Sequence, residues 1–135
     1  MEPHKPNVLL VDDDFVYQFA ATKTIEATGL AGHVQVCNDG QDAINYLNNA
    51  ISTSGIFPDI IFLDINMPVM DGWEFLEAYR AMEEKLPDSI SIYLVSSSVD
   101  KNDIMRSQQF KYVTDYLVKP VYKEKFSQVL QAAHN

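Results

Sequence analysis

The stretch Phe62-Leu63-Asp64-Ile65-Asn66-Met67-Pro68-Val69-Met70-Asp71-Gly72 decides the fold and points to the chemistry. An apolar run at residues 60–63 leads into a single carboxylate, Asp64, and a loop punctuated by proline and glycine follows. This pattern predicts a buried strand that ends at Asp64. In an open α/β sheet, ligands bind at the carboxyl ends of the strands. Asp64 is therefore the first candidate for a functional residue.

Length and composition indicate one compact domain. The 135 residues suit a single core, and we expect a short N-terminal arm over residues 1–6 and one domain over residues 7–135, with no output domain. No apolar run is long enough for a membrane span or a signal peptide, so we expect a cytoplasmic protein. The net charge of −9, without a basic cluster, disfavours nucleic acids and anionic membranes as partners. The single cysteine, Cys37, is expected in a buried strand.

Strand-like and helix-like segments alternate five times along the chain. Strands are predicted at residues 7–11, 33–37, 58–64, 89–95 and 115–118. Helices are predicted at residues 15–28, 41–49, 73–85, 100–110 and 122–133, with a loop at residues 50–57. The first helix is indicated by the spacing of Val16, Phe19, Ala20 and Ala27. The alternation predicts an α/β fold in three layers, with a parallel sheet between two layers of helices.

Polar side chains stand where the predicted strands end. Asp12 and Asp13 follow the first strand, Asp64 the third, Ser96 the fourth and Lys119 the fifth. Right-handed crossovers bring these strand ends to one edge of the sheet. Capping the next helix would need only one aspartate, at position 14, and neighbouring carboxylates without a partner repel one another. Three carboxylates in one pocket suit Mg²⁺, which prefers oxygen ligands.

This set of side chains fits one kind of chemistry. A carboxylate nucleophile, a divalent cation, a lysine and a hydroxyl can together accept a phosphoryl group as an aspartyl phosphate. The cation and Lys119 would neutralise charge on the equatorial oxygens while Asp64 attacks in line. Taken alone, Ser96 could cap a strand end and Lys119 could be a surface charge. Their joint occurrence at successive strand ends favours a functional site.

The motifs that carry these residues resemble the receiver domains of two-component response regulators, in particular stand-alone receivers of the chemotaxis type. They are Val11-Asp12-Asp13-Asp14, residues 63–72, Leu94-Val95-Ser96-Ser97 and Tyr116-Leu117-Val118-Lys119-Pro120. The resemblance covers essentially the whole chain. It implies a flavodoxin-like, doubly wound sheet of five parallel strands in the order 2-1-3-4-5, with five helices.

The resemblance also implies a function and partners. A histidine kinase or a histidine phosphotransfer protein would donate a phosphoryl group to Asp64, and the signal would pass to a downstream protein target. The domain would be a monomer or a weak dimer, and its only catalysis would be its own phosphorylation and dephosphorylation. The metal ligands would be Asp12, Asp13, Asp64 and the backbone carbonyl of Asn66, with Mg²⁺ as the cofactor.

Three further roles follow from the same resemblance. Ser96 would contact a phosphoryl oxygen, and Lys119, in a cis peptide bond with Pro120, would contact the phosphoryl group. Tyr116 stands where the family has an aromatic switch that turns inward when Ser96 moves; it could also be an ordinary half-buried strand residue. Two departures stand out. Tyr112-Val113 replaces the common Gly-Ala pair, and the loop at residues 48–57 is long.

Three other functions compete with this one. A haloacid-dehalogenase-type phosphatase would use Asp12-x-Asp14-x-Val16, but it needs an acidic motif after the lysine and leaves residues 64–68 unexplained. A flavodoxin-type module would bind a nucleotide phosphate at the first strand–helix turn, where Asp12 and its neighbours would repel it. A pseudo-receiver would bind partners without phosphorylation; a phosphoryl adduct on Asp64 would exclude it.

Overall fold

The structure is a computed structural model that describes residues 4–134, so residues 1–3 of the predicted arm lie outside the described residues. Five strands alternate with five α-helices and one short 3₁₀ helix. The strands are β1 (Val8–Val11), β2 (Val34–Cys37), β3 (Ile60–Asp64), β4 (Ser91–Ser96) and β5 (Val113–Val118). The helices are α1 (Phe15–Ala27), α2 (Gly40–Thr53), α3 (Gly72–Met82), η1 (Glu83–Lys85), α4 (Lys101–Ser107) and α5 (Lys123–His134).

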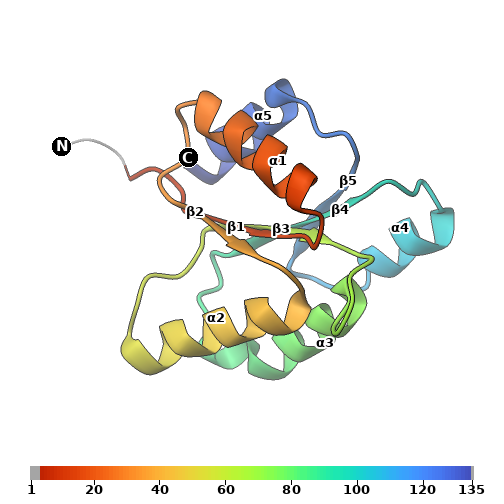
Figure 1. The fold of residues 1–135 in the computed structure, drawn as a ribbon. Helices are drawn as coiled ribbons and strands as arrows, with labels where there is room; N and C mark the ends of the chain where they lie inside the picture. Colours follow the sequence, from red (N-terminus) through yellow and green to blue (C-terminus); the bar gives the residue numbers. More distant parts are fainter. Residues whose placement is uncertain (1–3, 135) are drawn as a thin grey trace.

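All strand pairs are parallel, and their order is β2-β1-β3-β4-β5. Figure 1 shows α1 and α5 on one face of this sheet and α2 and α3 on the other. The predicted three-layer, doubly wound α/β fold and its strand order are therefore confirmed. Within residues 4–134, none of the helices has both the length and the apolar character that a membrane crossing requires.

The core consists of two apolar layers, one on each side of the sheet. Along β1 and β3, alternate residues point to opposite faces, as the two-residue repeat of a strand requires. Leu10 and Phe62 pack with Phe126 of α5, whereas Leu9 and Leu63 belong to the layer beneath α2 and α3. Both strands are buried along their full length. This double burial explains why their sequences are continuous apolar runs.

Helix α1 is buried on a different face from the one that its apolar residues suggest. The side chains that indicated the helix in the sequence are exposed, Val16 at 79% and Phe19 at 68%. Its buried face is formed by Gln18, Ala21 and Ile25, which follow helical spacing but include a polar residue. The predicted helix exists, and an apolar strip is left on its outside.

Several predicted boundaries need correction. Helix α2 runs on to Thr53, so the predicted loop at residues 50–57 was wrong for its first four residues. The reason is Ala50, which is buried and continues the inward face formed by Ala43 and Leu47. The predicted third helix ends at Met82 and continues only as η1, and α4 is shorter than predicted. Cys37 is buried in β2, as predicted.

Tyr112, which departs from the common Gly-Ala pair of the family, has a structural role at the start of β5. Its hydroxyl donates a hydrogen bond of 2.8 Å to the carbonyl of Leu76 in α3. Its ring lies 4.7 Å, centroid to centroid, from that of Tyr79. Burial raises the pKa of Tyr112 to about 12, so the hydroxyl stays protonated and can donate. A large side chain here anchors β5 to α3.

Candidate phosphorylation site

Three carboxylates meet at the carboxyl edge of the sheet. Asp12 directly follows β1, Asp13 is next to it, and Asp64 is the last residue of β3, the strand beside β1. One oxygen from each of the three lies within 4.8 Å of the others. Asp12 and Asp64 are buried, and Asp13 is exposed. The predicted convergence is confirmed, and the group offers the hard oxygen ligands that a divalent cation prefers.

Hydrogen bonds to the side chains of Asp12 and Asp14 hold the turn after β1, and Oδ1 of Asp12 accepts one of 2.9 Å from the amide of Asp14. Asp14 caps α1: its side chain accepts hydrogen bonds from the amides of Val16, at 2.9 Å, and Tyr17, at 3.2 Å. The Gln18 side chain donates to the carbonyl of Asp12 from within α1. The role of helix cap therefore accounts for Asp14 only. The carboxylates of Asp12 and Asp13 belong to the cluster with Asp64.

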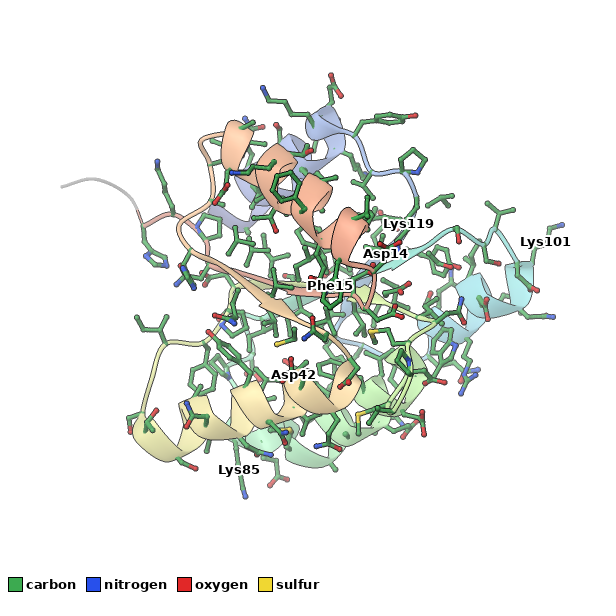
Figure 2. All side chains as sticks on the ribbon, viewed as in Figure 1. Asp14, Phe15, Asp42, Lys85, Lys101 and Lys119 are labelled. Carbon is green, nitrogen blue, oxygen red and sulfur yellow. The ribbon has the colours of Figure 1, made fainter. Side chains whose placement is uncertain are left out.

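Lys119 approaches the carboxylates from the end of β5. Its ammonium nitrogen lies 2.8 Å from Asp12 Oδ2 and 3.7 Å from Asp64 Oδ1. Its backbone amide donates to the carbonyl of Ser96, and the Lys119–Pro120 peptide bond is cis, as predicted. In Figure 2, Lys119 lies beside the start of α1, the helix that carries Tyr17. The fifth strand thus brings a cation into the acidic pocket.

The environment of Asp64 disfavours its charge. Burial is the main cause that raises the pKa of its carboxyl to about 6, and the charges of Asp12 and Asp13 raise it further. Lys119 and the backbone amide of Ile65 act in the opposite direction but do not balance the burial. The ionised carboxylate is therefore held at a cost in free energy that a bound cation would reduce.

A short chain of hydrogen bonds links the end of β4 to β5. Ser96 is buried, and its hydroxyl oxygen accepts a hydrogen bond of 3.0 Å from the amide of Ser98. The carbonyl of Ser98 in turn accepts a hydrogen bond of 3.0 Å from the hydroxyl of Tyr116. Tyr116 is half-buried. Ser96 and Tyr116, which the resemblance predicts to move together, are thus connected through the backbone of Ser98.

The loop after Asp64 is shaped by Gly72. A Cβ atom at this position would lie 2.7 Å from the carbonyl oxygen of Asp64, so a larger residue would push the loop away. The Gly72 amide donates to the carbonyl of Ile65, and Asp71 forms a capping box with Glu74 at the start of α3. Asn66, the predicted backbone metal ligand, lies exposed between these fixed points.

Two residues near the pocket were not singled out in the sequence. Gln18 joins two turns, because its amide group bonds both the Asp12 carbonyl and the Asn38 side chain. Tyr17 places its ring 4.1 Å from the ammonium nitrogen of Lys119. Both are in the first two turns of α1, directly after the aspartates. In the sequence, only their position directly after the aspartates indicates that these two residues lie near the pocket.

Comparisons with known proteins agree with this geometry. The sequence model described as "Response regulator receiver domain" matches residues 8–131. The chain belongs to the response regulator receiver family. Receiver domains are the phosphorylated modules of two-component signalling, and this family accepts the phosphoryl group on an aspartate.

Solved receiver structures cover nearly the whole chain. A two-component response regulator from Cytophaga hutchinsonii is 30% identical, with a TM-score of 0.87 over 96% of this chain and 98% of that one. The chemotaxis protein CheY4 of Vibrio cholerae is 26% identical, with a TM-score of 0.78 over 96% and 99% of the two chains. The predicted flavodoxin-like fold is confirmed by these neighbours.

A curated relative places a receiver of this kind within a longer protein. The transcriptional regulatory protein PrrA of Mycobacterium leprae is 38% identical over 115 residues, which are 85% of this chain. The match spans only 44% of PrrA. Receiver domains use Mg²⁺ in an acidic pocket and interact with histidine kinases and downstream effectors. In this receiver the acidic pocket is the group formed by Asp12, Asp13 and Asp64.

Proposed function

We propose that this receiver accepts a phosphoryl group on Asp64 from a histidine kinase or a histidine phosphotransfer protein. The observation that carries the proposal is the approach of Lys119 and three carboxylates to one point: the Lys119 ammonium lies 3.7 Å from Asp64, inside a cluster whose oxygens are within 4.8 Å. Asp64 is the nucleophile because it alone ends a strand that leads into a glycine-shaped loop.

We propose Mg²⁺ as the cofactor, held by Asp12, Asp13, Asp64 and the carbonyl of Asn66. The donor set fits it, because three carboxylates converge in a half-buried pocket. When bound, Mg²⁺ supplies positive charge that stabilises the oxygens of the transferred group. The chain's own residues do the rest. Asp64 provides the attacking oxygen, and Lys119 provides a fixed positive charge beside it.

The reaction exchanges one phosphorus bond for another. An oxygen of Asp64 attacks the phosphorus atom, an O–P bond forms, and the P–N bond to the donor histidine breaks. The bond electrons stay on the histidine nitrogen. Lys119 neutralises charge on the equatorial oxygens during the transfer. The chemistry of the domain is proposed to be limited to this step and to the later hydrolysis of its own aspartyl phosphate.

The conformational response is proposed to start at Ser96. A phosphoryl group on Asp64 adds roughly 1.5 to 2 negative charges. The hydroxyl of Ser96 would turn from the amide of Ser98 to a phosphoryl oxygen. Because Tyr116 bonds the carbonyl of Ser98, this change reaches β5 and shifts an existing equilibrium of the surface over residues 97–116 and α5. That surface would bind the downstream protein target.

The exposed strip of α1 is proposed as the contact with the phosphodonor protein. Phe15, Val16 and Phe19 are 73%, 79% and 68% exposed, and α1 starts three residues after Asp12. A donor histidine can reach Asp64 only from the carboxyl edge of the sheet, so its domain must cover this end of α1. Apolar surface beside the pocket would stabilise that encounter.

A comparison of two donors tests this contact. With Phe19→Ser, phosphoryl transfer from a histidine phosphotransfer protein should slow about tenfold or more, because the exposed ring is lost from the interface. Phosphorylation by acetyl phosphate, which needs no protein contact, should stay unchanged. Ile56→Ser, which removes a similarly exposed apolar side chain, at 74%, from the loop between α2 and β3, is the control and should affect neither reaction. Equal losses with both donors would contradict the contact.

The function itself is tested by intact mass after incubation with acetyl phosphate, with and without Mg²⁺. One phosphoryl adduct that requires Mg²⁺ and is absent in Asp64→Asn is the expected result. The absence of any adduct in the folded native chain would refute the proposal and favour a pseudo-receiver.

We further propose that the domain works in the cytoplasm, where the ATP that charges a histidine kinase is found, and that it acts as a monomer or a weak dimer. Its net charge of −9 opposes direct contact with nucleic acids.

A further inference from the structure

Tyr17 is packed against the head group of Lys119. The ammonium nitrogen of Lys119 lies 4.1 Å from the centroid of the Tyr17 ring. The same nitrogen lies 2.8 Å from Asp12 and 3.7 Å from Asp64. Only 19% of the Lys119 side chain is exposed. The charged group is therefore enclosed by two carboxylates and one aromatic face, which is an arrangement that attracts a cation.

The ring, and not the hydroxyl, is the part of Tyr17 that has a partner. Its hydroxyl oxygen is buried and has no hydrogen-bond partner among the described residues. Burial, and then the charges of Asp12 and Asp64, raise the pKa of the Tyr17 phenol well above its usual value. The side chain therefore stays neutral beside the acidic pocket. Phenylalanine would present the same face without an unpaired hydroxyl.

A divalent cation and Lys119 compete for the same carboxylate. Asp12 makes the shortest contact of the Lys119 ammonium, and it also belongs to the predicted metal ligands. A cation on Asp12 would weaken the hold on Lys119 and repel its charge. An aromatic face does not bind hard divalent cations, which take oxygen ligands. Tyr17 would thus keep its contact with Lys119 when Asp12 turns to the metal.

We propose that Tyr17 is a positioning residue for phosphoryl transfer, whose ring face holds the Lys119 ammonium at Asp64 while the carboxylates bind the cation. The inference rests on the proposed roles of Asp64 and Lys119 in accepting the phosphoryl group. It assigns a contribution to α1 that is separate from the exposed strip of Phe15, Val16 and Phe19, because Tyr17 faces the pocket and is half-buried.

Two substitutions at one position separate the ring from the hydroxyl. Tyr17→Leu should lower the rate of phosphorylation by acetyl phosphate at saturating Mg²⁺ about three- to tenfold, the range expected for a partly desolvated cation–π contact. Its affinity for Mg²⁺, measured by titration, should change less than about twofold. Tyr17→Phe should keep the native rate. A Phe variant as slow as the Leu variant would overturn the assignment to the ring face.

A double substitution tests whether the effect passes through Lys119. In a Lys119→Ala background, Tyr17→Leu should cause no further loss of rate, because the ring then has no ammonium group to hold. The same fold-loss in both backgrounds would overturn the proposal, since it would show that Tyr17 acts through packing alone. Thermal unfolding of every variant confirms that the folded protein is compared.

A spectroscopic measurement keeps this inference separate from the function on which it rests. In the native chain and in Tyr17→Phe, NMR signals of the Lys119 ε-methylene protons should be shifted upfield by the ring, and in Tyr17→Leu the shift should disappear. This readout needs no phosphorylation. If no adduct forms on Asp64 while the shift is present, the proposed function fails and the contact stands. If the shift is absent in the native chain, the positioning role is refuted.

Discussion

Strands β1 and β3 bury apolar side chains in their middle and carboxylates at their carboxyl ends. In the middle, Leu10 and Phe62 are about 1% exposed and belong to an apolar layer of the core. Two residues further, Asp12 and Asp64 are also buried, at 1% and 8% exposure, yet they are carboxylates that face each other and a third, Asp13. The same burial that stabilises the first pair costs free energy at the second.

This difference shows which part of the strands serves stability and which serves function. An apolar core residue gains from burial in every state of the domain. A buried carboxylate with a raised pKa gains only when a cation or a proton joins it. The carboxyl edge is thus less stable alone than with its ligand, which is the property expected of a site that binds a cation and is then modified.

The largest change in the free energy of unfolding is expected in the middle of β3. Phe62→Ala should destabilise the domain by about 3–5 kcal/mol, because it removes a ring that packs edge-on against Phe126 with centroids 5.1 Å apart. The free energy of unfolding in urea measures this. Folded protein should still be phosphorylated on Asp64. A loss of unfolding free energy below about 1 kcal/mol would show that the core can close around the cavity. The middle of β3 would then contribute less to stability than its burial suggests.

At the end of the same strand, a substitution is expected to raise the free energy of unfolding. Asp64→Asn should stabilise the metal-free domain at neutral pH by about 1–3 kcal/mol, because it removes a carboxylate whose pKa of about 6 lies above the unfolded value of 3.8. Between these two values the folded state binds more protons than the unfolded state. The native chain should therefore lose stability as the pH rises through this window, and the variant should lose less.

Thermal unfolding between pH 4 and pH 7, in the presence of a chelator, measures this difference. Asp59→Asn is the matched control, because Asp59 lies at the opposite edge of the sheet and accepts a hydrogen bond of 2.7 Å from the amide of Asn7. The control should give no gain in stability. If Asp64→Asn proves less stable than the native chain at pH 7, the buried carboxylate of Asp64 does not cost the domain stability.

The smallest change in stability is expected at two tyrosines whose hydroxyl groups each donate a hydrogen bond to a backbone carbonyl, one near the pocket and one away from it. Tyr116→Phe and Tyr112→Phe each remove one hydrogen bond to a backbone carbonyl, of Ser98 and Leu76 respectively, and each should cost about 0.5–1.5 kcal/mol. Only Tyr116 is linked to the pocket through Ser98 and Ser96.

The response to phosphorylation should therefore distinguish the two variants. Amide chemical shifts around α4 and β5 should change on addition of a phosphodonor in the native chain and in Tyr112→Phe, and they should change less in Tyr116→Phe. An unaltered response in Tyr116→Phe would assign Tyr116 to packing and leave Ser96 without this route to β5.

Much of the fold could be predicted because its signals are local. Continuous apolar runs such as residues 60–63 predict doubly buried strands, and a polar residue directly after each run marks the strand end. Parallel topology then requires those ends to share one edge, which is why the cluster of Asp12, Asp13 and Asp64 could be expected from the sequence. The strand order came from the resemblance, because no periodicity in the sequence specifies it.

The features that could not be predicted depend on tertiary contacts. The buried face of α1 contains Gln18, a polar residue whose partners are a carbonyl and a side chain on other segments. Its outward apolar strip, which includes Phe19, supplied the helical spacing that indicated the helix but does not face the core. The end of α2 was misplaced because Ala50 is a weak apolar signal. Tyr17 was overlooked because its partner, Lys119, lies about a hundred residues away in the chain.

The phosphoryl group is proposed to go to Asp64, the carboxylate at the end of β3 whose pKa is raised by burial. The most direct test is to treat the native chain with acetyl phosphate and Mg²⁺, reduce the acyl phosphate with borohydride, and map the modified residue by peptide mass spectrometry. Reduction should convert the residue at position 64, and no other aspartate, to homoserine. Homoserine at Asp12 or Asp13, or phosphorylation without any reduced residue at position 64, would contradict the account.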